Sequence, residues 1–394
     1  MIYFVVLLLL LILTVRYDIN GKTEYRDQWY NAVLVILILI AGLRFRLGVD
    51  TVNYIYMFYH DFPSLFDIDI DTFLASDQPP LWILLNSIVK TLGGRFFIVQ
   101  LIQAAILNTL VLKYFKKHSS YPFACVALYF FWRYQWFSMV VMKAALALSI
   151  ILYANDYFLE KKYKKGIILV LVATGFHQSS IVLIVTPFLT FLRFNVMGVA
   201  SLVFAYFFGA FLQSQLGDVF ALFEVADGLS NKLDNYLDSE FMTQGYNLTY
   251  FMLHIYPILF YSILSIVYLK RNCKESQILK FEPILMIALT FLMMQFNIAV
   301  MYRFAYLYSP YYILFVVYFF MEFSKKSMKL KNLLAYVRSF AIILPFLLSI
   351  AIVSPLLKDY FYPYSSIIER SFDKDREKHY AESVLFYNCN RDEF

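Results

Sequence analysis

The sequence predicts an all-α, polytopic integral membrane protein with about twelve transmembrane helices. Of its 394 residues, 61% are hydrophobic and only 16% are charged, and the mean hydropathy is +0.63. Soluble domains carry about 25% charged residues. Long uncharged apolar runs recur from Met1 to Pro355, and tyrosines gather near their ends, where lipid headgroups suit an amphipathic ring. This composition excludes a soluble enzyme, a disordered protein and a nucleic-acid-binding module.

Each predicted span is an apolar run, and a spanning helix needs about 20 such residues. We assign as spans residues 1–15, 29–43, 96–115, 121–138, 140–159, 166–176, 179–192, 196–212, 248–269, 283–300, 304–323 and 333–356. The first run has no basic residue before it and no small-residue cleavage site after it. We therefore expect a retained span rather than a signal peptide.

Charge in the loops predicts the side of the membrane on which each loop lies. The short basic loops are 16–26, 113–117, 161–165, 270–280 and 325–331, and the acid-rich loops are 50–77 and 218–240. Basic loops stay in the cytoplasm. The excess of 34 Lys and Arg over 28 Asp and Glu is thus topological. We expect one transmembrane domain over 1–357, with external loops 44–95 and 213–247, and a polar external tail over 358–394.

Two short apolar segments determine whether every basic loop can lie on the cytoplasmic side of the membrane. Residues 80–92 follow Pro79-Pro80 and precede Gly93-Gly94, so we expect a re-entrant or interfacial segment there. A full span there would place 161–165 outside. Residues 166–192 form either one long helix or two short ones that meet at His177, and the second interpretation keeps 270–280 inside and places His177 near the external face.

Polar groups at the external ends of the spans are the candidate functional residues, because polar groups are costly in a membrane. They are Arg44, Arg46, Asp50, Asp77, Gln78, Arg133, Lys143, His177 and Arg303. External cations oppose the charge bias, which makes them informative. Structural alternatives remain: arginines that anchor helix ends, an Asp50 that caps a helix or pairs with Arg46, and a His177 that only makes structural hydrogen bonds.

Motifs for nucleotide, dinucleotide or zinc binding do not occur in the sequence. Cys125, Cys273 and Cys389 lack metal-ligand spacing. We expect no metal and no cofactor. Arginine forks match phosphate oxygens, so external arginines beside aromatic residues favour an anionic, lipid-linked substrate handled from the outer side.

Four sequence elements resemble the EpsG family of Wzy-like bacterial polysaccharide polymerases. They are the stretch 42–54 (GLRFRLGVDTVNY), Gln78-Pro79-Pro80-Leu81-Trp82, Phe176-His177-Gln178-Ser179-Ser180 and Tyr302-Arg303-Phe304-Ala305-Tyr306. The elements occur in the family's order over most of the chain. Two positions depart from the family pattern: Lys143 stands where an arginine is usual, and Gln78 stands where relatives tend to carry glutamate.

The resemblance implies a polymerase that joins undecaprenyl-diphosphate-linked oligosaccharide repeat units at the outer face of the bacterial cytoplasmic membrane. Such enzymes serve capsule, exopolysaccharide and O-antigen pathways. The lipid diphosphate is the leaving group, so no nucleotide is needed. The implied partners are the lipid-linked oligosaccharide, the bilayer and other polysaccharide-assembly proteins, and nucleic acid is not among them.

The implied site roles follow from that reaction. Arg44, Arg46, Lys143 and Arg303 would contact the diphosphate, and His177 or Asp50 would be the base. Asp77, Gln78 and Arg133 would bind the diphosphate or the glycan. The main alternative is a flippase for lipid-linked oligosaccharides, although transporters of that kind usually show internal repeats. A ligase that attaches finished glycan to another acceptor is a third interpretation.

Overall fold

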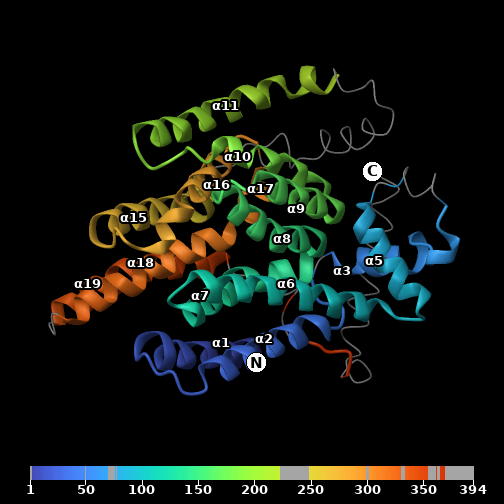
Figure 1. Ribbon diagram of the computed structural model, residues 1–394, viewed down its shortest axis with the longest axis horizontal. Helices are drawn as coiled ribbons and strands as arrows, with labels where there is room; N and C mark the ends of the chain where they lie inside the picture. The colour runs from blue at the N-terminus through green and yellow to red at the C-terminus, as the bar shows by residue number, and fades with distance from the viewer. Residues whose placement is uncertain are drawn as a thin grey trace. The chain divides into compact units, whose positions relative to one another are not determined.

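The computed structural model describes residues 2–48, 50–69, 76, 78–221, 248–298, 301–329, 333–353, 361 and 364–368. Regular structure within these ranges is helical, apart from one isolated β-bridge between Arg44 and Ser366 (Figure 1). The predicted all-α class is confirmed.

Five helical stretches are long and apolar enough to cross a membrane. They are Ile2–Ile19, Phe96–His118, Met142–Leu159, Phe251–Asn272 and Gln277–Met294, and shorter apolar helices occupy Gln178–Leu189, Val196–Leu212 and Ala341–Ile352. Many outward side chains are large and apolar, including Phe4, Leu8 and Leu11 on the first stretch. Such faces suit a lipid solvent. The membrane character is thereby supported, whereas the number of about twelve spans stays a prediction.

The chain divides into two compact units. The first comprises Met1–Ala154, Lys164–Leu183 and Ser354–Phe394, and the second comprises Asn155–Tyr163 and Ile184–Val353. The predicted division into a domain over 1–357 and a tail over 358–394 stays a prediction, and the described tail residues belong to the first unit.

The first unit is a set of packed helices around an apolar cluster. Its helices are α1 (Ile2–Leu13), α2 (Arg26–Gly42), α3 (Thr51–Tyr56), α5 (Pro80–Thr91), α6 (Phe96–His118), α7 (Pro122–Tyr129), the first part of α8 (Met142–Leu159) and most of α9 (Tyr163–Phe176). Helix α2 packs along α6, α1 packs on α7, and α5 packs on α6 (Figure 1). The cluster joins α3, α5, α6 and α8 through buried Tyr54, Trp82, Phe96 and Met142, and Phe176 packs against it.

Two predicted breaks are present in the structure. Helix α5 has 12 residues, so at 1.5 Å per residue it spans about 18 Å, which is too short for a hydrocarbon core of about 30 Å. Helix α9 ends at Phe176, and a 3₁₀ helix over Gln178–Val185 follows. His177 therefore lies at a junction between two short helices, as the second interpretation of this segment predicted.

The predicted spans 121–138 and 140–159, with Arg133 and Lys143 on either side of Trp136, imply an external turn near Trp136, and the structure shows that this expectation is wrong. The chain stays helical through two π-helical turns, Phe130–Tyr134 and Trp136–Val140, and is interrupted at Val141. The backbone of Val141, with φ −85° and ψ 55°, lies outside the helical region. Arg133 is therefore within a helix rather than beside a turn, whereas Lys143 lies in the first turn of α8.

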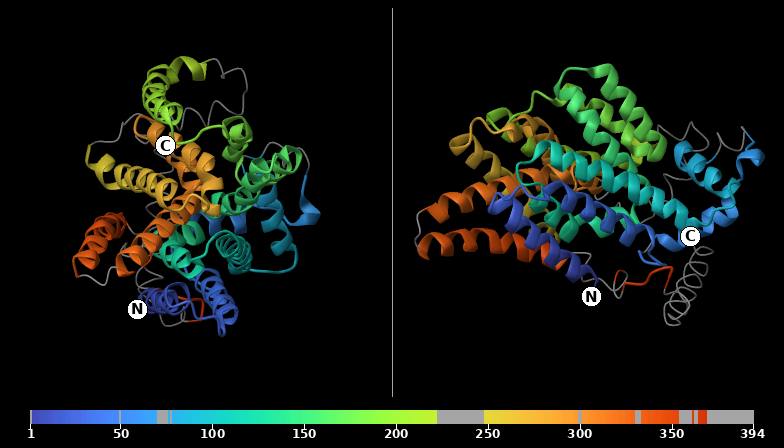
Figure 2. Two further views of the ribbon diagram at one scale, coloured as in Figure 1. Left: turned by 60° about the vertical axis from the view of Figure 1, so that its left-hand side comes forward. Right: turned by 60° about the horizontal axis from the view of Figure 1, so that its bottom comes forward.

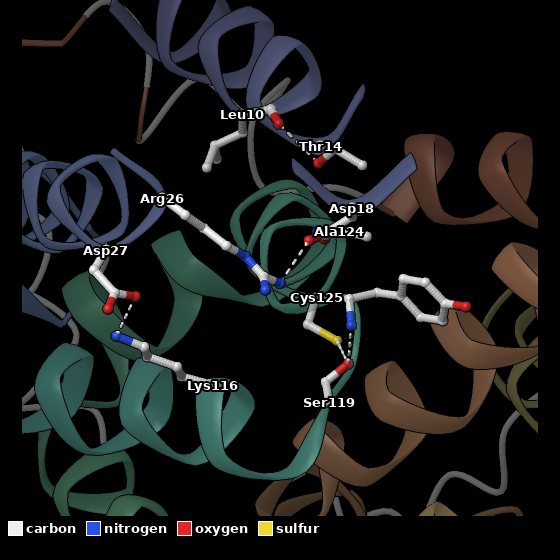
Figure 3. A network of polar contacts seen from close by, with 10 residues as sticks. Leu10, Thr14, Asp18, Arg26, Asp27, Lys116, Ser119, Ala124 and Cys125 are labelled. Atoms are coloured by element: carbon white, nitrogen blue, oxygen red, sulfur yellow. Dashed lines mark hydrogen bonds and ion pairs between the residues drawn. The ribbon is translucent and has the colours of Figure 1, made fainter. Parts of the chain in front are cut away.

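A buried carboxylate ties together the ends of α1, α2 and α7 (Figure 3). The side chain of Asp18 accepts a hydrogen bond from the backbone nitrogen of Ala124 at 2.8 Å and pairs with Arg26 at 3.4 Å. Lys116 at the end of α6 pairs with the exposed Asp27 at 2.8 Å. These contacts join loops 16–26 and 113–117, which the charge rule assigns to the same side of the membrane.

The second unit has its own buried carboxylate. Its helices are α10 (Thr186–Leu189), α11 (Val196–Ala221), α14 (Leu248–Tyr250), α15 (Tyr256–Asn272), α16 (Glu282–Met294), α17 (Tyr302–Leu307), α18 (Ser309–Lys329) and α19 (Leu333–Val353). Helix α11 packs on α16, and α18 packs against both α15 and α19 (Figure 2). Glu282 accepts from Lys270 at 2.5 Å and from the backbone nitrogen of Phe194 at 2.6 Å.

We expect Asp18→Ala to destabilise the protein, because it leaves a buried backbone N–H of Ala124 without its acceptor and Arg26 without its partner. Loss of one buried acceptor costs about 1–3 kcal/mol. The measurement is the midpoint of thermal unfolding in detergent. Asp27→Ala is the matched control, since its pair with Lys116 is exposed and exposed pairs contribute little. Equal midpoints for the two variants would contradict this assignment.

Candidate functional site

The loop between α2 and α3 rests on the helix break at Val141. Gly48 has φ +95°, a conformation that favours glycine, and a Cβ there would lie 2.5 Å from the carbonyl oxygen of Met139. The hydroxyl of Thr51 lies 3.3 Å from the same oxygen. The sequence Gly-Val-Asp-Thr thus lets the loop approach the backbone of the π-helical turn before α8.

Arg44 extends this contact with a buried guanidinium. The residue is 1% exposed, and its Nη2 donates to the carbonyl of Met139 at 3.4 Å and approaches Sδ of Met142 at 3.2 Å. Its Nη1 donates to the carbonyl of Ala41, whereas its Nε has no partner. No carboxylate within the described ranges forms an ion pair with it. Burial lowers the pKa of Arg44 to about 10, so the side chain is charged at neutral pH.

A cavity of about 150 Å³ opens beside this guanidinium. Three arginines line it: Arg44, Arg46 and Arg95. Tyr59, Gln100 and Ile367 also contribute to the wall, and none of the described residues that line it is acidic. A concave site with three cations and no acid favours an anion with several oxygens.

Lys143 and Gln78 form a second polar site in the same unit. Nζ of Lys143 donates to Oε1 of Gln78 at 2.8 Å and lies 5.7 Å from the ring centroid of Tyr54. Tyr54 in turn makes an edge contact with buried Trp82 at 5.5 Å. Neither Lys143 nor Gln78 lines the arginine cavity. The structure therefore brings together two of the predicted residues that lie far apart in the sequence.

His177 lies next to the element that carries Gln78. Its backbone nitrogen donates to the carbonyl of Ala173, and its carbonyl accepts from Ser180, both at 2.9 Å. Gly175 packs so closely on Leu81 that a Cβ would lie 2.6 Å from Cγ of that leucine. The junction at His177 is thus held against α5.

The remaining predicted residues have varied positions. Asp50 occupies the N-cap position of α3 without a side-chain capping hydrogen bond, so the capping interpretation is not supported. Arg133 is 6% exposed and lies 4.3 Å over the ring of Trp132. Arg303 is in α17 of the second unit, 5.9 Å from the ring centroid of Tyr302. Asp77 lies outside the described residues.

Of the residues that line the cavity, only Arg44 and Arg46 were selected from the sequence, and Arg95 and Ile367 are the additions that matter most for its chemistry and its wall. Arg95 is a basic residue at the predicted external end of a span, so the rule that selected Arg44 could have found it. Ile367 belongs to a carboxyl-terminal segment, and an isolated backbone bridge leaves no periodic pattern in a sequence. Within the described ranges, no group of three or more His, Cys, Asp or Glu residues could hold a metal ion.

The sequence comparison now adds to this geometry. A family model described as "EpsG family" matches residues 27–366, which is most of the chain. The chain belongs to the EpsG family. The match confirms the resemblance seen in the four sequence elements. EpsG is a family of Wzy-like polysaccharide polymerases, so membership implies a glycosyltransferase-like enzyme. Comparison with curated proteins and with solved structures gives no match.

We expect Gly48→Ala to destabilise this EpsG-family protein and to lower its activity. A residue with a Cβ strains the left-handed backbone by about 1–2 kcal/mol and would press on the Met139 carbonyl. Gly21→Ala is the matched control, because Gly21 also has positive φ, at +66°, but nothing lies within 4 Å of its Cβ position. Thermal unfolding in detergent measures both. Equal losses in the two variants would show that the close contact of Gly48 is unimportant.

Proposed function

We propose that this protein is a membrane polymerase that joins undecaprenyl-diphosphate-linked oligosaccharide repeat units into a surface polysaccharide. It does so at the outer face of the bacterial cytoplasmic membrane, from a bundle of about twelve spans. The observation that carries the proposal is the buried, charged Arg44, which no described carboxylate neutralises, beside a cavity with two further arginines. Family membership supplies the reaction class.

The reaction needs two kinds of group from the protein. A hydroxyl of the acceptor sugar attacks the anomeric carbon of the donor glycan, and a new glycosidic bond forms. The bond from that carbon to the diphosphate oxygen breaks, and the lipid diphosphate leaves with the electron pair. The hydroxyl proton passes to a base. Cations that stabilise the leaving charge and a positioned base therefore suffice, and no nucleotide is consumed.

The site residues divide between these tasks. Arg44, Arg46, Lys143 and Arg303 stabilise the departing diphosphate, because a guanidinium or ammonium strengthens its contact as charge develops. His177 or Asp50 accepts the proton. Gln78 holds the lysine at 2.8 Å.

Three further residues act in substrate binding. Gln78, Asp77 and Arg133 contact the diphosphate or the glycan. Amide, carboxylate and guanidinium groups suit the hydroxyls of a sugar, because each of them offers hydrogen-bond donors or acceptors.

Contacts within the first unit support the assigned sides of the membrane. Loops 16–26 and 113–117 meet around Asp18 and Asp27, and both were assigned to the cytoplasm. At the other end, the backbone of Phe45 pairs with Ser365, and both belong to segments assigned to the outside. A chain that crosses the membrane repeatedly has to group its loops in this way.

The function is tested by supplying purified protein with one defined lipid-linked repeat unit. We expect glycans of several repeat lengths to form without nucleotide, with release of lipid diphosphate. In cells that lack the protein, single lipid-linked units should accumulate on the outer leaflet. Accumulation on the inner leaflet would instead indicate a flippase, and full-length but unattached polymer would indicate a ligase.

The site assignment is tested by single substitutions. We expect Lys143→Ala to lower polymerisation by about 10²–10³, the cost of one lost charge-stabilising group, and His177→Ala to lower it by about 10²–10⁴, the contribution of a general base. Lys162→Ala is the control, because Lys162 is exposed and pairs only locally with Glu160. Each variant is compared at equal membrane abundance. Normal polymer from all of Arg44→Ala, Arg46→Ala, Arg303→Ala and His177→Ala would show the assignment to be wrong.

A further inference from the structure

We propose that Arg95 and the carboxyl-terminal segment 364–368 complete, with Arg44 and Arg46, a pocket that binds a phosphate or diphosphate group. Lys143 and Gln78 are not among the residues that line this pocket. Only the natural source of the ligand, the diphosphate of a lipid-linked glycan, rests on the proposed function. The binding site itself follows from the cavity and its wall.

The cavity selects a compact anion with many oxygens. Three arginines line one space, no acid among the described residues lines it, and the most buried of the three, Arg44, keeps a buried Nε without a partner. A single carboxylate saturates one arginine fork, whereas a diphosphate offers enough oxygens for several. A volume of about 150 Å³ is comparable to a cavity that holds one benzene molecule. That room suits a phosphate or diphosphate group.

Arg95 is free to contribute to binding. Arg95 is exposed, and its side chain makes no hydrogen bond, ion pair or ring contact with the described residues. The turn from α5 to α6 sets its position: Gly93 has φ +71°, and a Cβ on Gly94 would lie 2.7 Å from Cγ1 of Val89. The backbone of Arg95 is therefore held tightly while its side chain stays available to a ligand.

The carboxyl-terminal segment fixes the backbone on both sides of Arg44. The nitrogen of Phe45 donates to the carbonyl of Ser365, and the nitrogen of Ile367 donates to the carbonyl of Leu43, both at 2.9 Å. The side chain of Ile367 then forms part of the cavity wall. Displacement of this segment would open the pocket and release the loop that carries Arg44 and Arg46.

The anchor of this segment is deep in the first unit. The hydroxyl of Tyr364 donates to the carbonyl of Ile40 at 3.0 Å, and its ring makes an edge contact with Tyr3 at 5.8 Å. Ser365 is 2% exposed. The EpsG family match extends to Ser366, so it includes the residue that bridges to Arg44. The segment is thus part of the folded unit and a positioning element for the pocket.

The test is calorimetric binding of inorganic diphosphate to the purified full-length protein in detergent. We expect Arg95→Gln to weaken binding about 10-fold or more, since a charge-assisted hydrogen bond is worth about 1.5–3 kcal/mol. Ile367→Asp should weaken it as well, because it places a carboxylate in the wall. Arg16→Gln is the control, since Arg16 is outside the pocket and stacks on Tyr17. Unchanged affinity in Arg95→Gln would overturn the proposal.

Truncations test the wall without changing a side chain in it. A chain that ends after Lys378, which keeps the new terminal carboxylate away from Ile367 in the sequence, should bind diphosphate like the full chain, whereas one that ends after Leu357 should lose binding. Full binding by the shorter chain would show that segment 364–368 is not part of the pocket. If the shorter chain does not fold, the Ile367→Asp variant decides the same point.

Two further measurements separate the ligand source and the proposed function. A short polyprenyl diphosphate that binds more tightly than inorganic diphosphate supports a lipid-linked ligand, and equal affinity overturns that source. If diphosphate binding depends on Arg95 but the protein elongates no glycan, the proposed pocket stands and the proposed polymerase function is wrong. If the wild type polymerises the repeat unit but Arg95→Gln binds diphosphate with normal affinity, the proposed function stands and the proposed pocket is wrong.

Discussion

The arrangement of the first unit depends on the carbonyl of Met139 at the interrupted helix. This oxygen receives Nη2 of Arg44 and lies within hydrogen-bond distance of Thr51, while Gly48 leaves the space that both contacts need. A charged group buried in this way is costly unless acceptors surround it. The helix break at Val141 supplies such acceptors. The same break starts α8, so the position of Lys143 is set by the interaction that holds Arg44.

Charged side chains have different surroundings near the basic loops and around the cavity of the first unit. At the ends with basic loops, buried carboxylates are fully used: Asp18 pairs with Arg26, and Glu282 pairs with Lys270. Around the cavity of the first unit, three arginines face one space with no acid in its wall. Paired charges stabilise the fold, whereas the buried guanidinium of Arg44, which no carboxylate of the described residues neutralises, keeps its capacity to bind a ligand. This contrast is why the cavity, and not the Asp18 network, is the candidate site.

The sequence was sufficient for the helical class and for the short α5, it offered the break at His177 as one of two interpretations, and it selected Arg44, Lys143 and Gln78 as candidates. These follow from apolar run length, from proline and glycine positions and from cations that oppose the charge bias. The contact of Lys143 with Gln78 could not be read from the sequence, because it depends on how α8 packs beside α5. The helical path through Trp136 was also missed, since π-helical turns extend a helix through a stretch in which the apolar pattern suggests a turn.

The cavity wall combines residues from distant parts of the chain. Arg44, Arg46 and Arg95 come from the first quarter of the chain, but Ile367 comes from a segment that follows the last predicted span. The wall forms only after that span has placed the segment on the same side as the arginine loop. A complete anion site therefore requires that the whole chain has inserted with the correct orientation.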